Sequence, residues 1–148
     1  MDFKKILIIS LVLVAIFASL SVASAGLIED IFGGSDQNVT IEGENFTIPS
    51  GFEENVNESY EKSYGEFNTT YRYYEDLTNY ISITVDSYNS ESGAKDVGIY
   101  DAAVNKTISH KTGHFVKQGD ECMFIYRNGT KLVTVSTSDE ECLQQVIR

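Results

Sequence analysis

The sequence predicts an α+β fold with a mainly antiparallel β-sheet of hairpins and a meander, one internal helix, and a C-terminal helix packed on one face. Three observations lead to this class. Apolar–polar alternation of the kind found in half-buried strands recurs from residue 38 to residue 135. Turn-forming glycines interrupt that alternation at hairpin spacing. Helical periodicity is confined to residues 92–104 and to the segment after residue 138, and isolated helices among runs of strands are typical of α+β domains.

The first 25 residues predict a secretory signal peptide. Lys4-Lys5 forms a basic n-region, residues 6–20 are almost continuously apolar, and Ala23-Ser24-Ala25 has the small-x-small form of a cleavage site. We therefore expect cleavage after Ala25. An uncleaved anchor is the alternative, because residues 6–25 are long enough to span a bilayer. With either a cleaved signal peptide or a retained anchor, we expect the chain after residue 25 to lie outside the cytoplasm, as a secreted or cell-surface protein.

Residues 26–37 predict a spacer, in which one or two amphipathic turns from Leu27 to Phe32 would end at Gly33-Gly34. Residues 38–148 predict a single domain of ordinary size. Cleavage would remove Asp2, Lys4 and Lys5, which leaves 21 acidic and 9 basic side chains and a net charge of −12. This charge argues against nucleic acid and anionic membrane surfaces as partners, since both are polyanions. A membrane would be contacted only through residues 6–25, if they are retained. Solubility explains the acidic charge, and diffuse binding of cations or basic partners is the alternative.

Residues 38–48 predict the first hairpin, with a Gly43-Glu44 turn of the II′ kind. Pro49-Ser50-Gly51 ends its second strand, and Phe52 is expected to fold back onto the core. Residues 53–64 are polar and predict a loop, with a short strand near Tyr60. The apolar pairs expected in the hairpin are Ile41–Phe46 and Val39–Ile48.

Residues 67–73 and 81–85 predict two long, half-buried antiparallel strands joined at residues 76–79. On the first strand, Phe67, Tyr71 and Tyr73 share one face, against a more polar set on the other. Residues 92–104 predict the internal helix, which Gly98 weakens. Residues 106–117 predict two short strands hinged near Gly113.

Residues 121–135 carry the strongest local signal, a hairpin around Asn128-Gly129, which suits a type I′ turn. Both of its faces are fairly apolar, because Met123, Ile125 and Leu132 lie opposite the face that holds Cys122. A strand pair that is apolar on both faces is expected at the centre of a sheet. The pairs expected in this hairpin are Tyr126–Lys131, Phe124–Val133 and Cys122–Val135.

The last segment predicts a helix with Ser138 at the N-cap and a glutamate three residues later, as in a capping box. Its apolar stripe would cover the hairpin face that holds Cys122. Cys122 and Cys142 are the only cysteines, and this packing places them on facing surfaces. We therefore predict a disulfide between them, which an exported protein retains. It would close a loop of roughly 20 residues and contribute about 3 kcal/mol in the chain-entropy model.

Asparagine usage points to N-glycosylation. Six of the nine asparagines begin an N-x-S/T sequon, where chance would give one or two. The alternative is that exposed strands favour threonine and turns favour asparagine. The six candidates are Asn38, Asn45, Asn57, Asn68, Asn105 and Asn128.

The sequence predicts no catalytic residue, cofactor or metal site. His110 and His114 lack further ligands at zinc spacing, no acidic cluster has a calcium-loop pattern, and no G-x-S-x-G elbow is present. Tyrosines are numerous instead, and as a group they could line a carbohydrate or protein contact surface. The alternative is that they are sheet residues half in the core. The group comprises Tyr71, Tyr73, Tyr74, Tyr80 and Tyr88.

Three stretches carry a resemblance: Asn45–Phe52, Lys106–Ile108 ahead of Gly113, and the hairpin at 124–135 with its terminal helix. In these the chain resembles a group of small exported proteins of methanogenic archaea, for which no function is established. More distantly, its F-x-I-P-x-G-F segment is similar to the opening strand of PsbP/Mog1-like α+β domains. The chain departs from this group at two points: His110 stands where relatives tend to have glycine, and the pair Cys122 and Cys142 is additional to their pattern. The resemblance implies a setting and no activity.

These observations together predict an exported, non-enzymatic surface or binding protein, N-glycosylated and held by one disulfide. Its expected partner is a protein or carbohydrate of the cell envelope. The alternative is an accessory domain that binds a small ligand or assists the assembly of a cell-envelope complex. The expectation of a non-enzyme rests on the lack of any catalytic constellation in the sequence.

Overall fold

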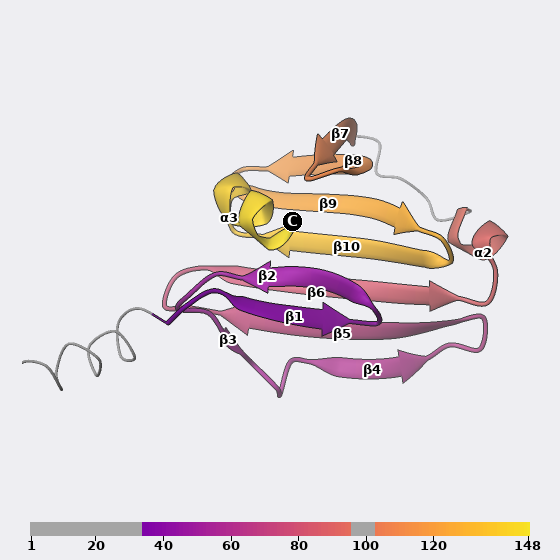
Figure 1. The fold of residues 1–148 in the computed structure, drawn as a ribbon, viewed down its shortest axis with the longest axis horizontal. Coiled ribbons are helices and arrows are strands. Elements are labelled where there is room, and N and C mark those ends of the chain that lie inside the picture. Colours follow the sequence, from indigo (N-terminus) through magenta and orange to yellow (C-terminus); the bar gives the residue numbers. More distant parts are fainter. Residues whose placement is uncertain (1–33, 96–102) are drawn as a thin grey trace, which may run out of the picture. The chain divides into compact units, whose positions relative to one another are not determined.

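The computed structural model describes residues 34–95 and 103–148, whose strands form an eight-stranded sheet and a separate two-stranded hairpin (Figure 1). Every strand pair is antiparallel, which confirms the mainly antiparallel class, and the helices are two short ones among the described residues. Sheet order is β3-β5-β6-β10-β9-β8-β7, with β4 also paired to β5. The elements are β1 (Gln37–Ile41), β2 (Glu44–Ile48), β3 (Glu53–Glu54), β4 (Tyr60–Ser63), β5 (Phe67–Glu75), β6 (Tyr80–Tyr88), α2 (Glu91–Lys95), β7 (Val104–Ile108), β8 (Lys111–Gln118), β9 (Glu121–Asn128), β10 (Lys131–Thr137) and α3 (Glu140–Val146).

One face of the large sheet is covered by the β1–β2 hairpin and by α3 (Figure 1). Ile41, Phe46 and Ile48 of the hairpin and Leu143 of α3 pack into the same apolar core as the sheet residues beneath them. Burial of these side chains supplies the main favourable free energy of folding. We call this side of the sheet the covered face. The fully buried sheet residues on it include Ile81, Ile83, Val85, Phe124, Val133 and Val135.

The C-terminal hairpin lies at the centre of the sheet, as predicted, but its register differs by two residues. Asn128 pairs with Lys131, so the turn is Gly129-Thr130. Gly129 has a φ of 60°, and glycine at the first central position is what a type II′ turn requires. A two-residue shift leaves each side chain on its predicted face, because the strand period is two. The face that holds Cys122 is therefore the covered face, as expected.

The first hairpin differs from its prediction in the same way. Ile41 pairs with Glu44 and Val39 with Phe46, so the turn is Glu42-Gly43. Both turn residues have positive φ, 51° and 80°, as a type I′ turn requires. The predicted II′ turn one residue later is therefore wrong, while the apolar side chains still share one face.

The β7–β8 connection turns at Ser109-His110, with φ of 43° and 73°, and not at Gly113. Gly113 lies inside β8 and is buried. A Cβ atom there would lie 2.2 Å from the carbonyl oxygen of Ile125 on β9. The glycine is thus needed for the close approach of two strands and is not a hinge.

Both helices begin or end differently from their predictions. The described part of the expected helix 92–104 is α2, and Val104 already begins β7, while 96–102 lie outside the described residues. The N-cap of α3 is Asp139 in place of Ser138, because the carboxylate of Asp139 accepts from the N–H of Cys142 at 2.8 Å. An aspartate cap with this bond is as favourable as a serine cap.

Three further local predictions are confirmed. Phe52 is buried, Tyr60 begins β4, and residues 76–79 join β5 to β6. Asp76 fixes that turn, since its Oδ1 accepts from the N–H groups of Thr78 and Asn79, each at 2.7 Å. These bonds hold the pKa of Asp76 below its usual value.

Residues 36–148 form one compact unit. The predicted signal peptide (1–25) and most of the predicted spacer (26–37) lie outside the described residues. Neither of the described helices has the length and apolar character needed to cross a membrane.

Candidate functional site

The face of the sheet opposite the hairpin carries most of the tyrosines. Side chains alternate along β5, so Thr70, Arg72 and Tyr74 point to the covered face and Tyr71 and Tyr73 point away from it. Tyr74, 4% exposed, therefore belongs to the core and leaves the predicted tyrosine group. The side chains on the other side of β4, β5 and β6 we call the aromatic face. Its rings are Tyr60, Phe67, Tyr71, Tyr73, Tyr80 and Tyr88.

Four tyrosines of this face form a continuous row across three strands, which we call the tyrosine row: Tyr60, Tyr71, Tyr73 and Tyr80. Ring centroids lie 5.1 Å apart from β4 to β5, 6.5 Å apart along β5, and 6.0 Å apart from β5 to β6. Interplanar angles of 23°, 21° and 12° make all three contacts stacked. Offset stacking of this kind adds to the stability of each ring's position. The row is therefore an ordered surface.

A second group of stacked rings lies at the other end of β5. Phe67 stacks on Tyr64 at 5.0 Å and on Tyr88 at 4.9 Å. The ammonium group of Lys62 lies 5.0 Å from the centroid of the Tyr64 ring. Helix α2 covers part of this end, since a Cβ atom on Gly93 would lie 3.2 Å from the Tyr88 ring. This end of the aromatic face is thus partly enclosed.

Tyr71, Tyr73 and Tyr80 of the tyrosine row keep the protons of their phenol groups at neutral pH. Partial burial is the main cause that raises the pKa of Tyr71, Tyr73 and Tyr80. Nearby carboxylates raise these pKa values further, Glu58 and Glu75 at Tyr73 and Glu121 at Tyr80. Each ring therefore offers an apolar surface and a neutral hydroxyl that can donate or accept a hydrogen bond.

The same side of the sheet continues over β9 and β8 with half-buried Met123, Ile125 and Val116. A shallow hollow of about 70 Å³ lies where Tyr80 meets Met123 and Val116. The open side therefore joins aromatic and aliphatic side chains across neighbouring strands. Surfaces of this composition are typical of the centres of protein contacts.

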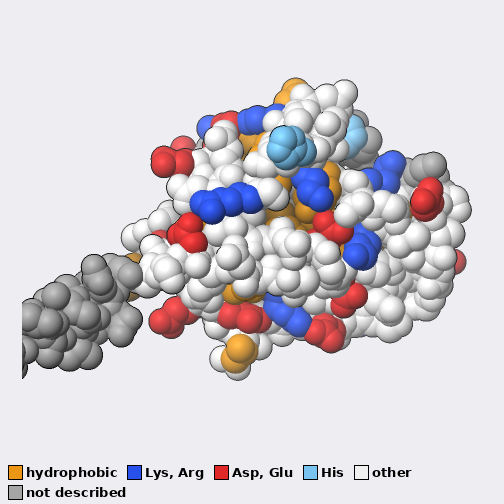
Figure 2. All heavy atoms as spheres, in the orientation of Figure 1, with side chains coloured by type: hydrophobic (Ala, Val, Ile, Leu, Met, Phe, Trp, Pro, Cys, Tyr) orange, Lys and Arg blue, Asp and Glu red, His pale blue; other side chains and the backbone are white. Residues whose placement is uncertain are grey.

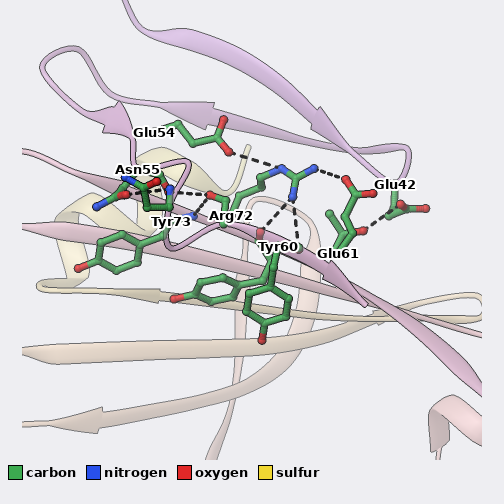
Figure 3. A network of polar contacts seen from close by, with 11 residues as sticks. Glu42, Glu54, Asn55, Tyr60, Glu61, Arg72 and Tyr73 are labelled. Atoms are coloured by element: carbon green, nitrogen blue, oxygen red, sulfur yellow. Dashed lines mark hydrogen bonds and ion pairs between the residues drawn. The ribbon is translucent and has the colours of Figure 1, made fainter. Parts of the chain in front are cut away.

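The strand that carries Tyr60 is held by an ion network on the other side of β5 (Figure 3). The guanidinium of Arg72 pairs with Glu54 at 3.6 Å, pairs with Glu61, and donates to the backbone oxygen of Tyr60 at 3.4 Å. Figure 3 shows the rings of Tyr60 and Tyr73 pointing away from this network. Arg72 thus ties β3 and β4 to β5 and supports the tyrosine row from behind.

The hairpin is fixed to the covered face by a buried carboxylate. Glu44, 3% exposed, lies 3.6 Å from the ammonium of Lys111 and 3.8 Å from that of Lys131. The side-chain amide of Asn128 donates to it at 2.6 Å, and Tyr126 is a further hydrogen-bond partner. A buried carboxylate is tolerated when it is paired and hydrogen-bonded in this way.

A wide acidic hollow of about 540 Å³ lies beside β3, lined in part by Glu53, Glu54, Glu75 and Asp76. Several of its polar groups already have partners: Glu54 pairs with Arg72, Glu75 accepts from an asparagine amide, and Asp76 holds its own turn. Within the described ranges, no three His, Cys, Asp or Glu side chains are placed to hold a metal ion.

All six sequon asparagines are exposed. Asn68 and Asn128 point to the covered face, and Asn38 and Asn45 lie on the hairpin above it. Asn105 lies on β7, at the edge of the sheet farthest from the tyrosine row, and Asn57 lies in the β3–β4 connection. None of the six therefore stands in the tyrosine row.

Both cysteines are buried free thiols on the covered side, Cys122 on β9 and Cys142 on α3. Helix α3 packs against β9, so the two elements face one another as predicted. The disulfide itself remains a prediction. Burial, the largest cause, raises the pKa of the Cys142 thiol to about 12.

Compared with known proteins, the chain matches no family model, no curated protein and no solved structure. The candidate site is therefore defined by geometry. Sequence reasoning found Tyr71, Tyr73 and Tyr80, but it missed Tyr60, the stacking of the rings and the acidic groups beside them. Tyr71 and Tyr73 are two residues apart on one strand, and this spacing in the sequence indicates that they share a face. The pairing of Tyr60 with Tyr71 depends on strand register, which the local sequence does not give.

Proposed function

We propose that this chain is an exported, non-enzymatic surface or binding protein that contacts a cell-envelope protein or carbohydrate through its aromatic face. The half-exposed tyrosine row carries the proposal, because folded monomers rarely leave a large contiguous apolar patch open. Tyrosine provides contact area at low entropic cost, together with a hydroxyl at the tip.

We further propose that carbohydrate is attached to the side opposite the tyrosine row. Asn38, Asn45 and Asn68 are exposed there, and a glycan on them would leave the tyrosine row accessible. Asn128 is the least suited of the six, because its amide nitrogen already donates to buried Glu44. Intact-mass analysis of the protein from its own host tests both attachment and cleavage after Ala25. A full-length, unmodified mass would contradict this part of the proposal.

The second candidate is an accessory domain that binds a small ligand or assists assembly of a cell-envelope complex. The acidic hollow beside β3 is the observation that favours a small ligand, since its volume of about 540 Å³ would admit one. Glu53→Gln, which leaves Glu75 and the ion pairs of Arg72 intact, should weaken such binding and leave contacts of the tyrosine row unchanged.

Binding of the purified domain to envelope material from its own host tests the main proposal. The double variant Tyr71→Ser/Tyr73→Ser should lower binding at least about tenfold, because truncation of central aromatic residues removes the largest contributions to an interface. The control is Val56→Ser/Leu77→Ser, which changes two apolar side chains that are 72% and 102% exposed but lie outside the row. Equal binding by both double variants would refute the proposal.

A further inference from the structure

Three carboxylates stand beside the tyrosine row: Glu58, Glu75 and Glu121, which we call the acidic rim. Glu75 lies two residues from Tyr73 on the same face of β5 and pairs with Tyr80 across the sheet, and Glu121 lines the same hollow as Tyr80. Glu58 is close enough to Tyr71 and Tyr73 to raise the pKa of both phenols. Glu121 is hydrogen-bonded to Tyr80 at the other end of the row. All three side chains belong to exposed residues. The row is therefore flanked along its length by negative charge.

The acidic rim differs from the carboxylates of the covered side in its lack of cations. Glu44 and Glu140 are each shared by two lysines, and Glu54 and Glu61 share Arg72. Within the part of the chain that the structure describes, none of the ion pairs reaches Glu58, Glu75 or Glu121. The rim therefore keeps its negative charge beside aromatic rings, in a chain whose net charge is already −11.

We propose that the tyrosine row and the acidic rim together bind an arginine-bearing basic segment of a protein partner. A cation over a tyrosine ring is attracted by the negative face of the π-system. A guanidinium is planar and can stack on an aromatic ring while its N–H groups donate to a neighbouring carboxylate. The row extends over four rings and three carboxylates, so the segment would present more than one basic side chain to it. This inference rests on the proposed function and names the chemistry of the partner.

The test uses a tetra-arginine peptide as the probe, with tetra-lysine and tetra-glutamate peptides of the same length for comparison. Isothermal titration calorimetry at low salt should show the order arginine, then lysine, with no binding of the glutamate peptide. Tyr73→Leu, which keeps an apolar side chain, should weaken arginine-peptide binding about five- to thirtyfold. Glu75→Gln/Glu121→Gln should weaken it about tenfold and reduce its dependence on salt.

Two matched controls keep the inference falsifiable. Tyr64→Leu changes a ring outside the row, next to Lys62, and Glu141→Gln removes an exposed carboxylate on α3. Both should leave the affinity for the arginine peptide unchanged. Absence of arginine-peptide binding, or equal losses in Tyr73→Leu and Tyr64→Leu, would overturn the inference. Circular dichroism of each variant confirms that its fold is intact.

Failure of this inference is distinguishable from failure of the proposed function. In one outcome, Tyr71→Ser/Tyr73→Ser loses envelope binding, while neither Glu75→Gln/Glu121→Gln nor competing arginine peptide affects it. That outcome would retain the aromatic face as a contact surface. It would also overturn the assignment of a basic segment as the partner. Envelope binding that both the rim variant and the arginine peptide abolish supports the two proposals together.

Discussion

The two sides of β6 carry different kinds of side chain although they belong to the same strand. Ile81, Ile83 and Val85 point to the covered face and are fully buried, whereas Tyr80 and Ser82 point to the open side and are half-buried. Aliphatic β-branched side chains fill a core without a polar group to satisfy. Tyrosine instead brings a hydroxyl that favours contact with solvent or a partner. The difference teaches that residue type, and not hydrophobicity alone, separates a core face from a contact face.

The arrangement of charge also differs between the two sides, and Figure 2 shows the side that carries the hairpin and α3. The side that carries the hairpin and α3 gathers Lys and Arg together with Asp and Glu, and there Glu44 and Glu140 each meet two lysines. The carboxylates at the tyrosine row meet no cation among the described residues. The covered side thus uses ion pairs to hold its elements together, whereas the carboxylates at the tyrosine row have only uncharged hydrogen-bond partners among the described residues.

The largest expected effect tests the division between core and contact face. Phe124→Ala on the covered face should lower the free energy of unfolding by about 3–5 kcal/mol, because it leaves a cavity in a fully buried site. Tyr73→Ala on the aromatic face should cost less, about 1–2 kcal/mol, because the half-buried ring loses two stacked neighbours but leaves no closed cavity. Urea denaturation measures both. Equal costs would mean that the aromatic face is as much core as the covered face.

The next effect concerns the cysteines of the covered side. Oxidation of wild-type protein should raise the free energy of unfolding by about 3 kcal/mol relative to the reduced form, if Cys122 and Cys142 pair. Cys122→Ser should show no such difference and should bind its partner as before. Thermal denaturation with and without reductant measures the change. Full stability of Cys122→Ser under oxidising conditions would rule the disulfide out.

Loss of the buried charge that fixes the hairpin should have an intermediate effect. Glu44→Gln removes the carboxylate shared by Lys111 and Lys131, and should cost about 1–3 kcal/mol because the remaining polar groups lose charged partners. Part of this cost is regained, since both lysines are partly exposed to solvent. Glu53→Gln, at an exposed position of β3, should change stability by under about 0.5 kcal/mol. Similar urea midpoints for the two variants would argue against Glu44 as an anchor.

The smallest effect appears at alkaline pH. Burial raises the pKa of Tyr74 to about 12, above its ordinary value of about 10, so the folded state resists its ionisation. A raised pKa contributes stability that is complete below pH 10 and is lost as pH rises towards 12. At pH 11 the loss should be roughly 1 kcal/mol, and Tyr74→Phe should abolish that part of it. If the free energy of unfolding of Tyr74→Phe fell as steeply as that of wild type between pH 10 and 12, ionisation of Tyr74 would not be the cause of the loss.

Much of the fold could be predicted from local signals. Alternation identified the long strands, and the two apolar faces of residues 121–135 placed that hairpin at the centre of the sheet. The turn positions were each wrong by one residue, because glycine fits either central position of a two-residue turn. Gly129 takes the first position and Gly43 the second, and local sequence does not distinguish these. The apolar alternation does not distinguish them either, because registers that differ by two residues keep the same faces.

The candidate site depended more on long-range contacts. On β5 the polar side chains Thr70 and Arg72 point to the covered side, which hydrophobicity alone would not suggest. They are accepted there because Thr70 donates to Glu42 in the hairpin turn and Arg72 pairs with Glu54 and Glu61. These partners lie 28, 18 and 11 residues away in the sequence, so no local pattern predicts them. Their pairing leaves Tyr71 and Tyr73 on the open face.

The sequence by itself determined the strands and hairpins, the acidic charge, the sequons and the pair of cysteines, because each depends on residue type and short spacing. The sequence also predicted that the C-terminal helix covers the face that holds Cys122, but only the tertiary structure decided that the β1–β2 hairpin covers the same face and which side of β5 joins it. A period of two says which side chains share a face but does not say which face becomes the core. That choice depends on contacts between distant segments, and it is what brings the tyrosine row and the acidic rim together on the open side.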